Sequence, residues 1–212
     1  MSTAREVANE GADGVVVCDA IEGFGTLREP SVSAVIWKRE MNSGFLEWIG
    51  SLAVNRLPSA RVVTTVAHLP KVMMAICNSV HVPYSMHRRV LIDDATRLAA
   101  HFADLMRVQA VRIRFDVVND NACRKFHVDA VTARLVCTYR GPGTQYGNGM
   151  QGEEPSRIFS VPSGSPLLLR GTHWPEEVRA GLLHRSPPIE GEDITRLVFV
   201  VDPVDDIEAM RH

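Results

Sequence analysis

From residue 110 onward the chain consists of short apolar runs that are separated by glycine, proline and small polar residues. The run from Val111 to Val118 alternates apolar residues with charged ones, which is the period of a strand buried on one face. Further strands are predicted at residues 133–139, 157–161, 166–170, 181–184 and 197–202. Many short strands with Gly and Pro turns between them indicate a sandwich or a barrel.

The first 109 residues differ, because helical periodicity dominates there. The clearest helix is predicted at residues 92–106, with Asp93 or Asp94 as its cap. Shorter elements are predicted as helices at 45–54, capped by Asn42 or Ser43, and 71–79, and as strands at 14–19 and 32–37.

Helices first and strands later predict an α+β fold, namely a double-stranded β-helix (a cupin-like jelly roll) with N-terminal helices packed on the sheet. We expect residues 1–212 to form a single domain. Within it, residues 1–109 would be a helix-rich support region and residues 110–204 the β-rich core that carries the functional site.

Composition narrows the class of function. The chain has 212 residues, 45% of them hydrophobic, and a formal net charge of −2, which gives no electrostatic case for binding nucleic acid or an anionic membrane. The four cysteines form no CxxC pair, and no apolar run approaches the roughly 20 residues of a membrane span. We therefore expect a cytoplasmic protein that acts on a small-molecule substrate, with a homo-oligomer left open.

His127 and Asp129 form a His-x-Asp tripeptide directly after a predicted strand and a polar turn. Alternate positions of an extended chain face the same side, so both side chains can reach one ion. Two imidazoles and one carboxylate on a β-framework are the ligand set of a non-haem iron(II) site. The pair therefore predicts a metal site that needs one further histidine.

His184 is the favoured third ligand, because it ends a short apolar run before Pro187 and Pro188 turn the chain out of the sheet. His173 is the rival, but Pro175 and two following glutamates make its segment resemble a loop or a helix start. Cys123 could also approach the metal, although packing alone can account for a small residue at a strand margin. No catalytic residue beyond the metal ligands is predicted.

Arg196 begins the apolar run at 197–201, so its guanidinium would be costly to bury without a carboxylate partner. That partner can be an acidic co-substrate or a structural salt bridge with Asp129, Asp202 or a glutamate, and both interpretations stay open.

Hydrogen-bond donors on and just after the predicted strand at 133–139 are further candidates for binding the carboxylate of a ligand. They are Arg134, Thr138, Tyr139, Arg140 and Thr144, of which Tyr139, Arg140 and Thr144 join Arg196 as predicted co-substrate contacts. A surface strand could also carry such residues for solubility.

Three blocks of the chain resemble a bacterial family of uncharacterised proteins, domain-of-unknown-function family 1826. They are residues 123–129, residues 133–144, and residues 183–188 together with 196–202. This resemblance implies no established reaction. Members of the family are often associated with zinc-responsive gene neighbourhoods, which leaves a role in metal homeostasis open.

The order of His-x-Asp, distal His and Arg on the next strand also resembles the iron(II)- and 2-oxoglutarate-dependent oxygenases. The resemblance implies that His127, Asp129 and His184 bind Fe(II) and that Arg196 binds the far carboxylate of 2-oxoglutarate. The chain departs from the frequent Arg-x-Ser arrangement, since Leu197 and Val198 follow the arginine.

We therefore expect a dioxygenase that hydroxylates or desaturates a small or amino-acid-like molecule. The alternative is a cupin-like metal-dependent enzyme or metal-binding protein that works without 2-oxoglutarate, with a link to zinc homeostasis.

Overall fold

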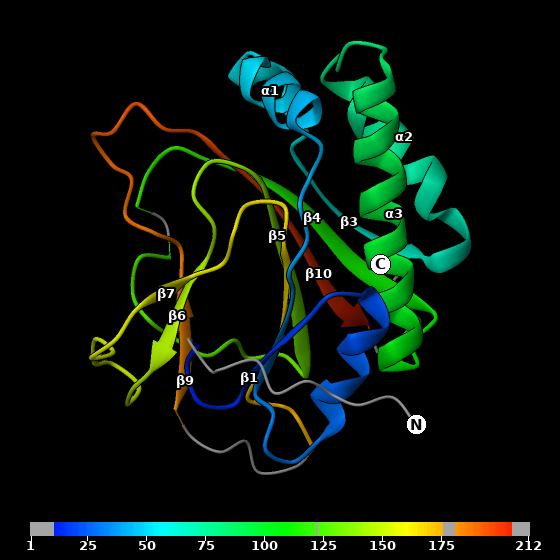
Figure 1. Cartoon of the computed structure of the whole chain (residues 1–212). Helices are drawn as coiled ribbons and strands as arrows, with labels where there is room; N and C mark the ends of the chain where they lie inside the picture. Colours follow the sequence, from blue (N-terminus) through cyan, green and yellow to red (C-terminus); the bar gives the residue numbers. More distant parts are fainter. Residues whose placement is uncertain (1–10, 122, 176–180, 205–212) are drawn as a thin grey trace.

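The computed structural model describes residues 11–121, 123–175 and 181–204 (Figure 1). Its strands are β1 (Val15–Cys18), β2 (Ala34–Trp37), β3 (Ala60–Thr65), β4 (Ala110–Val118), β5 (Ala133–Arg140), β6 (Gln145–Asn148), β7 (Phe159–Ser160), β8 (Pro166–Arg170), β9 (Leu182–Arg185) and β10 (Arg196–Val204). Seven of them form one sheet in the order β1-β2-β8-β5-β10-β4-β3, and β7-β6-β9 form a smaller sheet. Only the β1–β2 pair is parallel among these strands, so the predicted α+β class is confirmed with a large, mainly antiparallel sheet.

The helices are α1 (Ser43–Ser51), α2 (Leu69–Ser79), α3 (Met86–Met106) and the short 3-10 helices η1 (Ile21–Arg28), η2 (Val54–Arg56) and η3 (Val66–His68). Asn42 caps α1 as predicted, because its Oδ1 accepts a hydrogen bond of 2.9 Å from the Gly44 N–H. The cap predicted for α3 is wrong. That helix begins six residues earlier than expected and is capped by Ser85, whose hydroxyl accepts from the Arg88 N–H at 3.1 Å.

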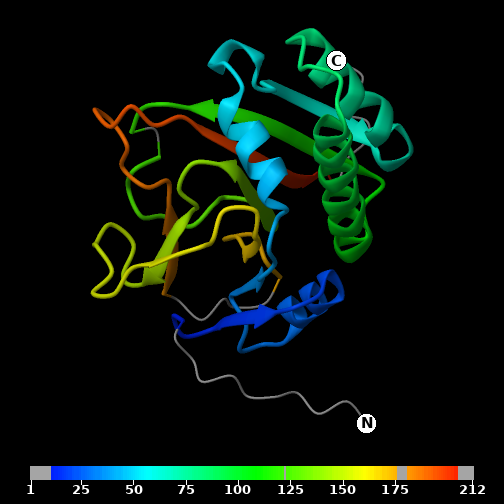
Figure 2. The ribbon, with the colours of Figure 1, turned by 45° about the horizontal axis from the view of Figure 1, so that its top comes forward.

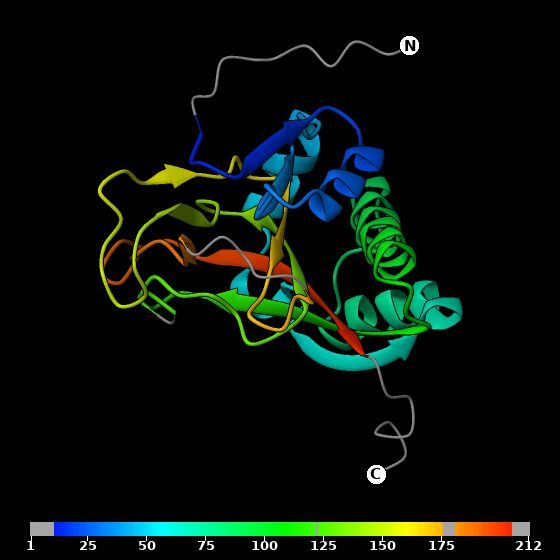
Figure 3. The ribbon, with the colours of Figure 1, turned by 90° about the horizontal axis from the view of Figure 1, so that it is seen from below.

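The helices and the small sheet lie on opposite sides of the large sheet (Figure 3). α3 buries Leu98 and Phe102 in the same apolar core as Ile113 of β4 and Phe199 of β10. Each of these side chains is fully buried, which stabilises the fold by about 1.5–3 kcal/mol per residue. The helices cover one face of the large sheet with an apolar core. A functional site can therefore lie on its other face, between the two sheets.

The N-terminal region supplies more than support, since β1, β2 and β3 all join the large sheet. β1 and β3 are its two edge strands, at opposite ends of the sheet (Figure 2). The sequence did not predict β3, whose residues are mostly half-buried, or β6, which reads Gln-Tyr-Gly-Asn and has little apolar alternation. The division at residue 110 therefore does not separate a helical part from a sheet part.

Within the part of the chain that the structure describes, no helix combines the length and the apolar character that crossing a membrane requires.

Candidate metal centre

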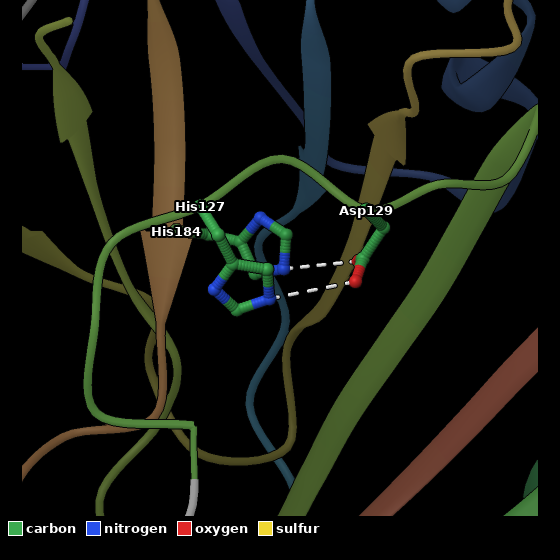
Figure 4. A group of neighbouring side chains, drawn as sticks. All are labelled: His127, Asp129 and His184. Carbon is green, nitrogen blue, oxygen red and sulfur yellow. Dashed lines mark ion pairs between the residues drawn. The ribbon is translucent and has the colours of Figure 1, made fainter. Parts of the chain in front are cut away.

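His127, Asp129 and His184 lie together between the two sheets (Figure 4). One ligand atom from each residue lies within 4.8 Å of the others. The Nε2 atom of His184 is 3.0 Å from Asp129 Oδ2, and the Nε2 atom of His127 is 3.5 Å from Asp129 Oδ1. The structure thus brings together the three residues that the sequence predicts as metal ligands.

The backbone explains why the two imidazoles meet. The N–H of His127 donates to the carbonyl of His184 at 3.1 Å, and the N–H of His184 donates back at 3.0 Å. The two residues are therefore directly opposite each other in an antiparallel pair, where side chains share a face. Their ring centroids are 4.6 Å apart. Asp129, two residues further on, then reaches the same point from the side of the large sheet (Figure 4).

Asp129 is held by Arg134 of β5. The Nη1 of that arginine donates to Asp129 Oδ1, while its Nε and Nη2 donate to the two oxygens of Asp202 at 2.6 and 2.9 Å. Burial alone would raise the pKa of Asp129, but its contacts with His127, His184 and Arg134 outweigh burial and hold that pKa far below the usual value. The carboxylate is therefore ionised and fixed in direction.

The second oxygen of this carboxylate, Asp129 Oδ2, is buried and accepts no hydrogen bond from any described residue. It faces His184 Nε2, and burial lowers the pKa of that imidazole and so favours its neutral form. Burial of an anionic oxygen beside a neutral ring nitrogen costs free energy, because its charge is not compensated. A bound cation would supply that compensation.

His127 has the tautomer that metal ligation needs. Its Nδ1 is 2.8 Å from the carbonyl oxygen of Lys125, which can only accept, so Nδ1 carries the proton. In the neutral ring this leaves the lone pair on Nε2, the atom that faces Asp129. Contact with Asp129 is the main reason why the pKa of His127 is raised. The donor set of two imidazoles and one carboxylate fits iron(II), with coordination positions left open.

A cavity of about 380 Å³ opens beside the cluster. Its wall includes His127, His184, Cys123, Arg114, Arg134, Thr144, Ser186 and Arg196, and an apolar strip of Val136, Val198 and Val200. The volume is that of a site for small molecules, and many of the side chains that line it are charged.

Arg196 lines this cavity with a fully buried side chain (0% exposed). Its Nε donates to the Pro142 carbonyl at 2.7 Å, its Nη1 to the Ser186 hydroxyl at 2.8 Å and its Nη2 to Thr138 Oγ1 at 3.4 Å. Neither Asp129 nor Asp202 pairs with it, since both bind Arg134. Burial lowers its pKa to about 10, which still leaves the guanidinium charged at neutral pH. Among the described residues this buried cation has no carboxylate partner, which excludes the predicted structural salt bridge there.

The turn at 141–143 lets this arginine fit. Gly141 has φ +77°, and a Cβ at that position would lie 2.9 Å from Arg196 Cγ. A side chain at 141 would therefore be strained and would press on the guanidinium stem.

Some of the other predicted site residues line the cavity and some do not. Thr144 and Cys123 line the cavity, as does Arg134. His173 is exposed and is not part of the cluster.

The prediction that Tyr139 and Arg140 face the site needs correction. Tyr139 is fully buried on the helix side of β5, where its hydroxyl donates to Asp94 at 2.6 Å. Arg140 donates to the carbonyl of Leu52, just beyond α1, at 2.7 Å. Neither residue lines the cavity. Alternation along β5 puts Arg134, Val136 and Thr138 on the cavity side and Tyr139 on the other.

Sequence reasoning missed Ser186 and Arg114. Ser186 lies two residues after His184, a spacing that puts both on one side of an extended chain, so alternation could have found it. Arg114 was seen only as part of an alternating strand, and its position in the cavity depends on how β4 pairs with β10.

The fold of this chain is similar to that of two dioxygenases of known structure. The crystal structure of the dioxygenase for auxin oxidation from rice has a TM-score of 0.53 and 12% identity, covering 92% of this chain and 84% of that one. The dioxygenase for auxin oxidation 1 from Arabidopsis thaliana, in its complex with 2-oxoglutarate, has a TM-score of 0.50 and 10% identity, covering 92% and 94%. At such identities the likeness is one of fold alone.

The chain itself belongs to the family described as "Protein of unknown function (DUF1826)", whose model matches residues 19–202. This confirms the resemblance that the sequence indicated. No curated protein matches the chain.

Proposed function

We propose that this protein is a non-haem iron(II)- and 2-oxoglutarate-dependent oxygenase that hydroxylates or desaturates a small molecule. The observation that carries the proposal is the pairing of two incomplete sites in one cavity. Among the described residues, buried Asp129 Oδ2 lies 3.0 Å from His184 Nε2 without forming a hydrogen bond at the first site, and buried Arg196 has no carboxylate partner at the second. Iron(II) would complete the first and a carboxylate of 2-oxoglutarate the second.

His127, Asp129 and His184 would hold the iron through Nε2, one carboxylate oxygen and Nε2 respectively. Bound iron(II) supplies activation of dioxygen, which couples oxidation of 2-oxoglutarate to succinate and carbon dioxide with oxidation of a substrate C–H bond. Arg134 fixes the direction of the Asp129 carboxylate by binding it together with Asp202.

Arg196 would bind the far carboxylate of the co-substrate, with the Ser186 and Thr138 hydroxyls beside it. Ser186 would supply a hydroxyl beside this arginine, because its Oγ lies 2.8 Å from Arg196 Nη1. Thr144 offers a further hydroxyl in the same wall. Because Arg196 is out of contact with solvent, its attraction for an anion is weakly screened.

In this function the two facing sheets would serve as the walls of a double-stranded β-helix. The large sheet contributes Arg114, Arg134, Arg196 and the apolar strip, and the small sheet, extended by the backbone bridge at His127, contributes both histidines. A site held on strands from two facing sheets is rigid, which is what a metal centre with open positions needs.

The test is turnover of 2-oxoglutarate. Purified protein with iron(II), oxygen and 2-oxoglutarate should form succinate in a slow uncoupled reaction, and His127→Ala should abolish it while exposed His173→Ala should not. Absence of succinate from iron-loaded wild type, together with tight zinc binding at the same three residues, would favour the alternative of a metal-binding protein without 2-oxoglutarate.

A further inference from the structure

Arg114 is a second arginine of the cavity whose binding capacity is mostly unused. Its Nε is buried and has no hydrogen-bond partner among the described residues. Its ion pair with Asp116 is loose, at 3.7 Å from Nη1 to Oδ2, which is too long for a hydrogen bond. A guanidinium offers five N–H donors, so Arg114 can still take a bidentate anion.

Two other arginines of the cavity already have carboxylate partners. Arg134 binds both Asp129 and Asp202. Arg185 pairs with Glu154 at 2.9 Å and donates to Gln145 at 2.8 Å. Among the described residues that line this cavity, Arg196 and Arg114 are the arginines whose guanidinium groups have no hydrogen-bonded carboxylate.

These two arginines occupy different parts of the cavity. In the β4–β10 register, Arg114 is opposite Val200, whereas Arg196 is opposite Val118. The two positions are four residues apart in this register, which is about 13 Å along the strand direction. Val198, which is opposite Asp116, lies at the level between them, and Val200 is beside Arg114. One small dicarboxylate held at Arg196 would therefore leave Arg114 free for another ligand.

We propose that Arg114 binds a carboxylate of the primary substrate, which makes the substrate a small carboxylic acid. This inference rests on the proposed function, because it assigns Arg196 to 2-oxoglutarate. The apolar strip beside Arg114 would pack against the hydrocarbon part of the substrate. Asp116 is next to Arg114 in the wall, so an amino group beside the carboxylate would also find a partner. Amino acids are therefore the first members of this class to test.

The experiment measures binding to the full chain loaded with zinc(II), a metal without redox chemistry, and saturated with 2-oxoglutarate. The probes are the proteinogenic L-amino acids, the amines formed by their decarboxylation and the acids formed by their deamination, screened by saturation-transfer NMR and titrated by calorimetry. We expect at least one carboxylate to bind, the matching amine not to bind, and Arg114→Ala to weaken binding roughly tenfold or more. Amino acids that bind better than their deaminated acids would confirm the part played by Asp116.

Arg112→Ala is the matched control, because Arg112 is on the same face of β4 but is exposed and outside the cavity. Arg114→Lys keeps the charge, and its melting temperature shows whether position 114 tolerates replacement. The inference is overturned if no carboxylate binds wild type, or if carboxylates bind Arg114→Ala as tightly as wild type.

Failure of the proposed function would look different. Arg114→Ala should keep its affinity for 2-oxoglutarate, whereas Arg196→Ala should lose it. If wild type binds no 2-oxoglutarate, the proposed function fails. The same carboxylate titration on protein with zinc alone then decides whether Arg114 is an anion site.

Discussion

The two faces of β5 and β10 differ in how completely their polar groups are paired. On the helix side, the Tyr139 hydroxyl and the Arg39 guanidinium both bind Asp94, at 2.6 Å each, inside an apolar core. On the cavity side, Arg196 has no carboxylate and Asp129 Oδ2 has no donor among the described residues. Buried polar groups normally have hydrogen-bond partners. The paired groups on the helix side therefore indicate a structural role, and the unpaired groups on the cavity side indicate a binding site.

Loss of an aromatic side chain on the helix side should have the largest effect on stability. Phe199 is fully buried and packs on Phe115 with ring centroids 4.7 Å apart. Phe199→Ala should lower the free energy of unfolding by about 3–5 kcal/mol. Chemical denaturation measures this, with metal affinity of the folded protein as the control. A stability like that of wild type would mean that this core does not hold the fold together.

Loss of a ligand on the cavity side should affect metal binding instead. His184→Ala should weaken metal affinity by at least about 100-fold, because it removes a ligand rather than an outer-shell partner. His173→Ala should leave the affinity unchanged, since His173 is exposed and outside the cluster. Competition with a metal-binding dye measures both, and equal affinities in the two variants would remove the assignment of His184.

Arg134 should have an intermediate effect, because it positions Asp129 without touching the metal. Arg134→Met frees the carboxylates of Asp129 and Asp202 and should weaken metal affinity roughly 10- to 100-fold. Arg112→Met on the same face of the sheet is the control. The same dye competition, read beside the melting temperature, separates lost positioning from lost folding. Unchanged affinity in folded Arg134→Met would show that Asp129 needs no such support.

The smallest expected effect is a pH dependence of the metal-free protein. Asp129 raises the pKa of His127 above 6.5, so this ion pair stabilises the fold fully below pH 6.5 and is lost as the pH rises through the raised pKa. His127→Gln should remove that part of the pH profile. Melting temperatures of metal-free wild type and His127→Gln between pH 5 and pH 9 measure it. A stability difference between the two proteins that grows with pH would contradict this account.

The site residues that were predicted best are those whose direction follows from the two-residue alternation of side chains along a single strand. His127 and Asp129 were found because they are two residues apart after a strand, and His184 because prolines end its strand. The same rule, applied to residues 133–140, separates Tyr139 from Thr138 and would have removed Tyr139 from the site. Within the described residues, most strands and the three α-helices were predicted from periodicity, with shifted ends such as the start of α3.

Contacts that depend on how distant strands pair could not be predicted from alternation within one strand. The contact of Ser186 with Arg196, the sharing of Arg134 between Asp129 and Asp202, and the position of Arg114 all depend on strand register. β3 was missed because most of its residues are half-buried, as on an edge strand, so their apolar alternation is weak. Pairing with β4 places this strand in the sheet.

We propose that one cavity would hold iron(II) at His127, Asp129 and His184 and 2-oxoglutarate at Arg196. The most direct test is an anaerobic titration of iron(II)-loaded protein with 2-oxoglutarate, followed by visible absorption. We expect a charge-transfer band in wild type that saturates with 2-oxoglutarate. In Arg196→Ala the same band should need at least roughly tenfold more co-substrate. No band in iron-loaded wild type, or equal saturation in the two proteins, would contradict this proposal.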